Sequence, residues 1–459
     1  MTHFTRLIPV AGVLLAALAL IPDESIGFTT LGGSLGINQR DFRVYNNFTD
    51  ATANDNVTPD PRFPGFVGAP LAIWKACIEW GSEPHADGGG DPHQSILGSG
   101  GSNFDPSFQG LTNQVGGQNA NIHSAISGND GSTLAFMEGS FGGVSDGWRI
   151  RYFEGWEWDD GPGTNISGFD LQGVAAHEYG HALGLGHSSA NNATMRGSII
   201  QDGVPDRSIA QDDIDGIQSI YSTVASDKPR ITDIQYLGAY IEITGTNFTP
   251  ENNQVWFTNG GLTGDGTPVM VTGVDSLESG TRLQVFVPSD AGSGDVLVRK
   301  NATGFTSLSN TYPFDSSLVT QSGGINYCVA TPNSSFASGA IMAVSGSNSI
   351  SANQFTIEVS SAKPDSFGIF FYGPNQVSVP TADGIRCIGG GTLGLTRLGS
   401  QATNSAGFAE RLIDFTDPLT PLSTIAVGSL RHFQFFYRDT DGGPAGFNFS
   451  DAITVIFLP

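Results

Sequence analysis

The chain has 459 residues, enough for about three domains. Hydrophobic residues make up 39% of it and charged residues only 14%, so it can build real cores and wholesale disorder is excluded. Its 44 acidic residues exceed the 20 basic ones and leave a formal net charge of −24, which argues against nucleic acid as a partner because phosphates would be repelled.

The first segment is predicted to be a signal peptide, which we place at residues 1–27. An uncharged apolar stretch over residues 7–21 follows Arg6. It is shorter than the roughly 20 residues of a membrane span but suits the apolar region of a signal peptide. Small residues near Ala19 and Gly27 offer two cleavage points. We therefore expect a secreted protein with no membrane span, and leave open whether it is associated with a cell surface.

Residues 28–224 combine strands with three helical segments. The predicted elements are a helix over 70–80, a strand over 148–154, a helix over 170–184 and a helix over 208–221. Ile73, Cys77 and Trp80 form an apolar stripe at helical spacing on the first helix. Asp170 suits the N-cap of the second helix and Gly184 its end.

Helical periodicity disappears after Ser226. Short strands bounded by Gly, Asn or Pro follow over residues 228–315 and again over 325–459, with a Ser- and Gly-rich linker between. The fold class is therefore multidomain: an α+β domain at 28–224 followed by two all-β sandwich domains at 228–315 and 325–459.

The chain has three cysteines, Cys77, Cys328 and Cys387. Export permits disulfides, and the two cysteines of the C-terminal region are expected to pair. Cys77 is expected to stay free and buried in its helix.

The strongest motif is a run of three histidines that begins at His177. His177 and His181 are four residues apart on a predicted helix, so both imidazoles can reach one Zn²⁺. Gly184 can take a positive φ and turn the chain so that His187 reaches the same ion. Three neutral nitrogens leave a fourth position for water, the pattern of a catalytic site. Glu178 is placed to act as general base on that water and to deliver the proton to the leaving amine.

This motif resembles that of the metzincin zinc endopeptidases. The likeness implies a metzincin-like catalytic domain, a twisted mixed sheet with three helices, in which Met195 forms a methionine turn beneath the metal. Ser188, directly after the third histidine, is similar to the matrixin branch. Residues 211–221 resemble the closing helix of matrixins, which implies that Asp212 and Asp213 are structural anchors; solvated acids on a helix are the alternative reading.

The sequence departs from the matrixin pattern at three points. Arg196 and Gly197 stand where matrixins usually have Pro and Tyr, so pocket preferences are not carried over. No latency cysteine in its usual setting precedes the domain, and Cys77 reads as a core thiol.

Further metal sites are weaker predictions. His85, Asp87, His93 and His123 invite a second zinc, but their order fits matrixins poorly and we favour solvated loop histidines. The acidic loops at 87–91 and 159–163 leave Ca²⁺ open as a second cofactor beside the one catalytic Zn²⁺.

The β-rich remainder carries no ligand-spaced cluster. Residues 228–315 resemble an IPT/TIG immunoglobulin-like domain, and residues 325–459 resemble β-rich C-terminal modules of secreted bacterial proteins, so an extracellular protein or a polysaccharide is the kind of ligand they would take. The predicted function is a secreted zinc endopeptidase acting on protein or peptide substrates, and the alternative is an inactive metzincin-like adhesion or binding protein. A chain that ends near Ser226 is expected to fold alone.

Overall fold

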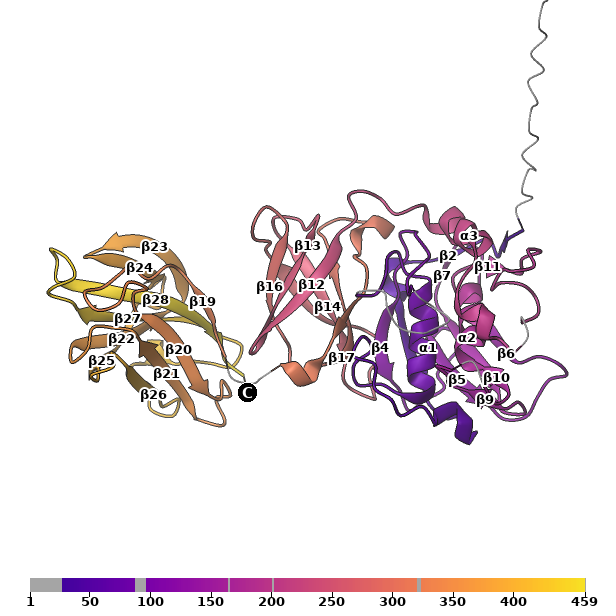
Figure 1. Cartoon of the computed structure of the whole chain (residues 1–459), viewed down its shortest axis with the longest axis horizontal. Helices are drawn as coiled ribbons and strands as arrows, with labels where there is room; N and C mark the ends of the chain where they lie inside the picture. The colour runs from indigo at the N-terminus through magenta and orange to yellow at the C-terminus, as the bar shows by residue number, and fades with distance from the viewer. Residues whose placement is uncertain (1–26, 87–95, 164–165, 200–201, 320–322, 459) are drawn as a thin grey trace, which may run out of the picture.

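A computed structural model describes residues 27–86, 96–163, 166–199, 202–319 and 323–458. The predicted signal peptide up to residue 26 lies outside the described residues, as do Asp87, His93 and the acidic loop at 87–91. The chain is multidomain and rich in strands, with three α-helices among the described residues, all before residue 222. Three large hydrophobic cores follow one another along the molecule, built from residues 35–221, 231–314 and 340–457 (Figure 1). None of the described helices has the length and apolarity needed to cross a bilayer.

The first core lies between a five-stranded mixed sheet and two helices. The strands, in spatial order, are β4 (Ser107–Leu111), β3 (Asp41–Tyr45), β5 (Ile122–Ile126), β8 (Trp148–Phe153) and β6 (Ala135–Gly139). Neighbours are parallel except for β6, which runs antiparallel to β8 and forms one edge. Helices α1 (Gly68–Glu79) and α2 (Leu171–Ala182) pack on each other, and the Trp80 indole after α1 donates a hydrogen bond to the Ala176 carbonyl of α2 (3.0 Å).

Short pairs of strands and a third helix close this domain. The pairs are β1 (Thr29–Thr30) with β11 (Leu185–Gly186), β2 (Ser34–Leu35) with β7 (Val144–Ser145), and β9 (Trp158–Asp159) with β10 (Phe169–Asp170). Helix α3 (Gln211–Tyr221) begins three residues later than residue 208, where the sequence placed its start. The Tyr221 hydroxyl at its end donates to the Leu183 carbonyl (2.9 Å), which ties α3 to the end of α2.

The second unit is a sandwich of two antiparallel sheets. One contains β12 (Arg230–Leu237), β13 (Tyr240–Thr246) and β16 (Arg282–Phe286); the other contains β15 (Val269–Val274), β14 (Asn253–Asn259), β17 (Ala291–Arg299) and β18 (Tyr312–Phe314). Ile241 and Ile243 of the first sheet share one core with Val255, Phe257 and Val296 of the second. Burial alternates along β13 and β16, as expected for strands with one face in the core, and this is why the sequence predicted strands at these positions.

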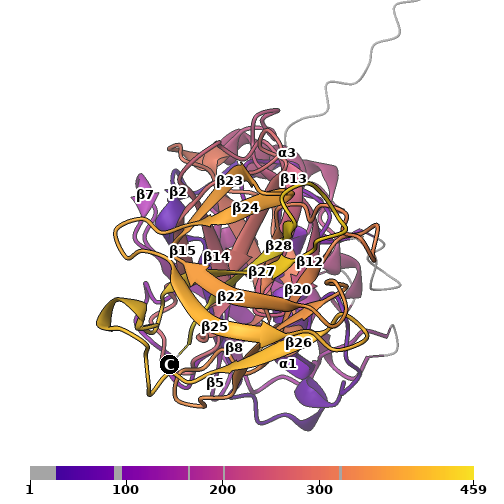
Figure 2. The ribbon, with the colours of Figure 1, turned by 90° about the vertical axis from the view of Figure 1, so that its left-hand side faces the viewer.

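The third unit is also a sandwich, with a hairpin added outside it. One sheet has five strands, in spatial order β19 (Ile325–Tyr327), β28 (Phe447–Ile456), β27 (Leu430–Arg438), β22 (Phe367–Gly373) and β25 (Thr396–Ala402). The other sheet has three strands, β20 (Ile341–Gly346), β21 (Phe355–Ser360) and β26 (Ala409–Ile413). The hairpin is β23 (Asn375–Thr381) with β24 (Gly384–Gly389). A disulfide joins Cys328 to Cys387 of β24. Figure 2 looks along the molecule onto this unit.

The first two units share a buried polar interface. The Asp295 carboxylate of β17 accepts a hydrogen bond from the Trp74 indole of α1 (3.0 Å) and pairs with the fully buried His85 imidazole (2.9 Å). Lys228 forms a buried ion pair with Asp105 (2.7 Å). These groups belong to opposite sides of the boundary, so neither side is complete without the other.

The same interface also contacts α1 and β4 of the first unit. Helix α1 is buried along its whole length, Lys75 and Glu79 included. The second unit contacts it at Trp74, whereas Lys75 pairs with Asp60 (3.3 Å) and Glu79 accepts from the Ile209 amide (3.2 Å), both within the first unit. Strand β4, at the other edge of the sheet from β6, lies beside β14 and β17, and Thr258 donates to the Phe108 carbonyl of β4 (2.7 Å). Independent folding of residues 28–224 stays a prediction, and the buried pairs across the interface lead us to expect that a chain ending near Ser226 is destabilised.

Candidate active site

The N-terminus of α2, the helix that carries His177 and His181, is held by a cap and an ion pair. The Asp170 carboxylate caps this helix by accepting from the Gly173 amide (2.6 Å). The guanidinium of Arg207, fully buried, forms an ion pair with the same carboxylate and donates to the Pro162 carbonyl (2.8 Å). Arg207 belongs to no motif, so it was not identified from the sequence as a residue that supports the site. It links the loop before α3 to the start of α2 and so fixes the helix that carries the histidines.

The three histidines converge. His177 and His181 project from α2, and Gly184 with a φ of +103° reverses the chain so that His187 returns to them. One potential ligand atom of each imidazole lies within 4.8 Å of those of the other two, and this trio is the one metal-binding cluster found among the described residues. The Nδ1 atom of His177 hydrogen-bonds to the Thr194 carbonyl (2.7 Å) and that of His181 to the Leu185 carbonyl (2.8 Å).

These carbonyls determine the form of the two imidazoles. A carbonyl accepts only from a protonated Nδ1, so Nε2 is left as a free lone pair. Burial and the neighbouring His181 lower the pKa of His177 to about 3, and burial lowers the pKa of His181. Neutral imidazoles with free Nε2 atoms are the donor set that Zn²⁺ prefers, so the residues present fit the ion that the motif implies.

Glu178 lies next to the histidines at the edge of the sheet. It is 6% exposed, and the backbone of Met137 in β6 hydrogen-bonds to it. Burial raises its pKa to about 8 in the absence of a metal ion. A carboxyl group in this setting is poised to accept and release a proton near neutral pH.

The floor of the site is a buried turn that contains Met195. A Cβ atom added to Gly180 of α2 would overlap the Met195 sulfur, so the helix approaches the turn as closely as glycine permits. The buried Asp213 carboxylate of α3 accepts hydrogen bonds from the amides of Thr194 (2.8 Å), Met195 (3.0 Å) and Ala210 (2.9 Å).

Asp212 makes the second link. It accepts from the amides of Gly27 (2.8 Å) and Phe28 (3.1 Å) and from the Ser188 hydroxyl (2.6 Å). These contacts are those of the anchoring role inferred for the two aspartates. They join the start of the described chain, the residue after the third histidine and α3.

His177, Glu178 and His187 line a cleft of about 510 Å³. Its apolar lining comes from Leu134, Ala135, Trp156, Phe169, Val174 and Ile199. Arg196, which replaces the usual matrixin proline, donates to the carbonyls of Ser198 (3.0 Å) and Ile199 (3.1 Å) and so shapes the wall of the cleft. Trp156, which the sequence analysis missed, packs edge-on against Phe169 at 5.4 Å between ring centres.

Two of the histidines considered for a second zinc, His85 and His123, are buried, so the expectation of solvated loop histidines is wrong for them, and His93 lies outside the described residues. His85 is fully buried against Asp295, and His123 is fully buried between the Tyr152 hydroxyl (2.9 Å) and the Cys77 sulfur (3.4 Å). Both imidazoles became buried because the sheet and the second unit close over them. Cys77 itself is free and buried in α1.

In the loop at 159–163, the Asp159 carboxylate accepts from the amides of Gly161 (2.9 Å) and Ser167 (2.8 Å). Both of its oxygens thus organise the loop itself. Asp160 is buried and accepts from the Asn56 amide. Calcium at this loop stays a prediction.

Comparison with known proteins assigns this domain to a class. Residues 120–222 match the family described as Matrixin, so the chain contains a metzincin-like domain of the metalloprotease type. Similar curated proteins are matrix metalloproteinase-25 of Mus musculus (49% identical over 67 residues, 14% of this chain and 11% of that protein) and metalloendoproteinase 1 of Glycine max (54% over 59 residues, 12% and 18%). Interstitial collagenase of Bos taurus is 50% identical over 58 residues, 13% of this chain and 12% of its own.

The similarity is confined to a small part of each protein. The chain spans less than a fifth of the length of these relatives. Among solved structures, a tetra-tandem repeat from the extending region of a large adhesion protein overlaps half of this chain with a TM-score of 0.17 and 8% identity. The match at residues 120–222 contains the three histidines, Glu178, Met195 and α3.

Proposed function

We propose that the chain is a zinc endopeptidase that hydrolyses peptide bonds within protein substrates. The observation that carries the proposal is the convergence of three histidines, two with Nδ1 tied to a carbonyl, beside Glu178 in an open cleft. His177, His181 and His187 would hold the ion. Bound zinc supplies a Lewis acid for the scissile carbonyl and lowers the pKa of water.

The residues of the chain supply the remaining parts of the reaction. Strand β6 is an edge of its sheet, so its outward backbone groups are available to an extended peptide. The apolar wall of Trp156, Phe169 and Ile199 takes a large apolar side chain of that peptide. Glu178 accepts a proton from the attacking water and gives it to the leaving amine.

We further propose that the protein acts after export. The uncharged stretch at 7–21 and the Cys328–Cys387 disulfide support this location, since disulfides persist in oxidising compartments.

Peptide hydrolysis by the purified full-length chain, measured with its metal content, tests the proposed activity. Glu178→Gln should keep about one zinc per chain, because the ligands are intact, while kcat falls by about 10²–10⁴. His181→Ala should lose the ion, since two ligands rarely hold a catalytic zinc. A chelator should abolish the wild-type activity.

Two results would contradict the proposal. One is full activity in a zinc-loaded Glu178→Gln variant, which would remove Glu178 from the chemistry. The other is a zinc-loaded wild-type chain that cleaves no member of a broad peptide library, which would favour the inactive binding protein.

A further inference from the structure

The C-terminal unit has a half-covered apolar sheet face. On the outer face of its five-stranded sheet, Phe371 and Phe449 are covered by the β23–β24 hairpin through Cys387 and Ile388. The backbone of Cys387 and the side chain of Gln434 in β27 hold the hairpin there (3.0 Å). The turn of the hairpin reaches the backbone of Phe447, whose carbonyl accepts from the Asp383 amide (3.0 Å), but no residue of the hairpin lines the part of the face beyond it.

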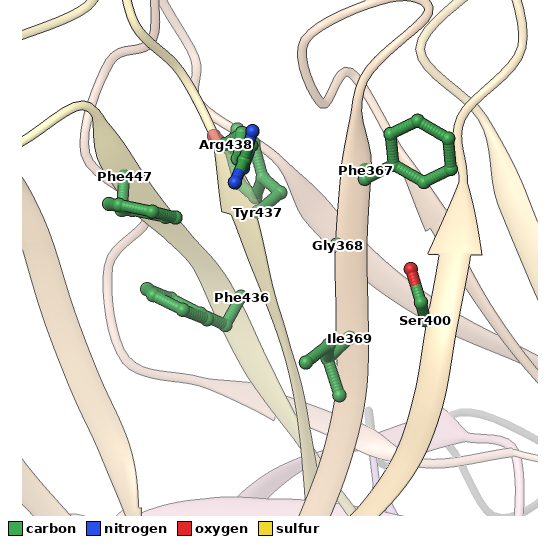
Figure 3. Close-up of a pocket in the computed structure, with 8 residues that line it drawn as sticks. All are labelled: Phe367, Gly368, Ile369, Ser400, Phe436, Tyr437, Arg438 and Phe447. Carbon is green, nitrogen blue, oxygen red and sulfur yellow. The ribbon is translucent and has the colours of Figure 1, made fainter.

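The uncovered part forms a cleft of about 370 Å³. Figure 3 shows Phe436 and Phe447 on one side of it and Phe367 with Ser400 on the other. The Phe436 and Phe447 rings stack at 5.3 Å and 15°. Phe367 is 62% exposed, which is costly for so large an apolar side chain and typical of a binding surface.

The cleft has a charge opposite to that of the whole chain. Its lining contains one cation, Arg438, and no anion, whereas the chain carries a net charge of −24. The Arg438 guanidinium lies 5.9 Å from the centre of the Phe447 ring, which holds it at the rim. Such a cleft complements an acidic group flanked by apolar side chains.

The lining favours a peptide over a saccharide. Ser400 and Arg438 are the polar side chains on offer, because the Tyr437 hydroxyl is already bonded to Asn333 (3.1 Å). A saccharide would leave most of its hydroxyl groups without partners there. A peptide can place apolar side chains on the phenylalanines, and β25, the last strand of the sheet, offers its free edge for backbone hydrogen bonds.

We infer that this cleft binds an extended protein segment in which aromatic or aliphatic residues alternate with acidic ones. The binding goes beyond the proposed hydrolysis and does not depend on it. A segment held here would increase the local concentration of a protein near the first unit.

Fluorescence anisotropy of a short fluorescein-labelled peptide in which phenylalanine and aspartate alternate tests the inference. The full-length chain carries Glu178→Gln so that the probe is not consumed. Phe367→Ser should raise the Kd about tenfold, because an exposed aromatic anchor is lost. Arg438→Gln should remove the preference for this probe over one with lysine in place of aspartate. Leu412→Ser is the matched control: Leu412 is 59% exposed on β26 of the other sheet, and this change should leave Kd unaltered.

Three outcomes would overturn the inference. They are the absence of saturable binding, equal effects of Phe367→Ser and Leu412→Ser, and displacement of the probe by an oligomer of galacturonic acid, which would make the cleft a saccharide site. Thermal unfolding of each variant, expected to match the parent chain, separates a loss of binding from a loss of folding.

Discussion

Two buried titratable groups, His123 and Cys77, are in contact in the core of the first unit. Neither group lines the cleft beside the three histidines. Burial raises the pKa of the Cys77 thiol well above its usual value and lowers that of His123 to about 3. Both groups are thereby held neutral, and His123 becomes a source of acid sensitivity.

Stability should fall as the pH drops because of His123. Its pKa is near 6.5 in the unfolded chain and about 3 in the folded one, so protons bind preferentially to the unfolded state. The contribution is fully present above pH 6.5 and is lost progressively toward pH 3. Between pH 7 and pH 4.5 the loss should be about 2–3 kcal/mol.

Urea unfolding of wild type and His123→Gln at both pH values, with a chelator present, measures this loss. The drop in unfolding free energy should be smaller in the variant by that amount. Comparing the two proteins cancels groups such as Asp41, whose pKa burial raises to about 7. Identical drops in both proteins would show that His123 does not titrate in this way.

At the scale of elements, the site is held by contacts between α2, the Met195 turn and α3. The Asp213 carboxylate satisfies three backbone amides at once, two of them in the turn. A buried amide that loses its acceptor retains its full desolvation cost. The closing helix α3 therefore fixes the turn beneath the three histidines.

Asp213→Asn should lower the unfolding free energy by about 1–3 kcal/mol, because an amide has only one acceptor oxygen for the three donors. Asp215→Asn is the control, since Asp215 is exposed on the same helix and its change should stay within about 0.5 kcal/mol. Denaturant unfolding of the zinc-loaded variants gives both numbers. Equal effects of the two substitutions would contradict this role of α3.

At the scale of the whole molecule, the two edge strands of the first sheet differ in whether another unit covers them. The second unit covers β4, while β6 stays free beside the cleft. An exposed strand edge can pair with another chain, so covering β4 removes one such edge, and β6 is the edge that our proposal assigns to the peptide substrate. Arg40 strengthens the covered side: its guanidinium lies 4.5 Å from the Phe104 ring centre of the first unit and 5.1 Å from that of Phe305 in the second.

Truncation after Ser226 should therefore destabilise the first unit. The cut removes Asp295 and Lys228, leaving His85 and Asp105 without their buried partners, and exposes Trp74. Loss of one partner of a buried pair costs about 3–5 kcal/mol. Truncation after residue 319, which removes only the third unit, is the control and should keep the melting temperature of the first. Equal melting temperatures for the two truncated chains would show that residues 28–224 fold independently of the second unit.

The histidine motif and the residue patterns of the strands each involve residues close together in the sequence. Both could therefore be predicted from the sequence alone. Spacing alone placed His177, Glu178, His181, Gly184 and His187 in one group. Helix α2 spans Leu171–Ala182, inside the predicted range of 170–184, and Gly184 has a positive φ. Strands β13, β14, β16 and β17 overlap their predicted ranges. Burial alternates along β13 and β16, whereas β14 and β17 contain continuous buried runs.

Contacts between residues far apart in the chain were decided only by the tertiary structure. Asp295 and His85 are 210 positions apart, and Arg207 and Asp170 are 37 apart. No periodicity or motif couples such positions, because pairing depends on which surfaces meet once the units have folded. For the same reason the sequence led us to expect His85 and His123 in solvated loops, whereas both are buried. Burial depends on which surfaces meet after folding, and a sequence shows only the identity of its side chains.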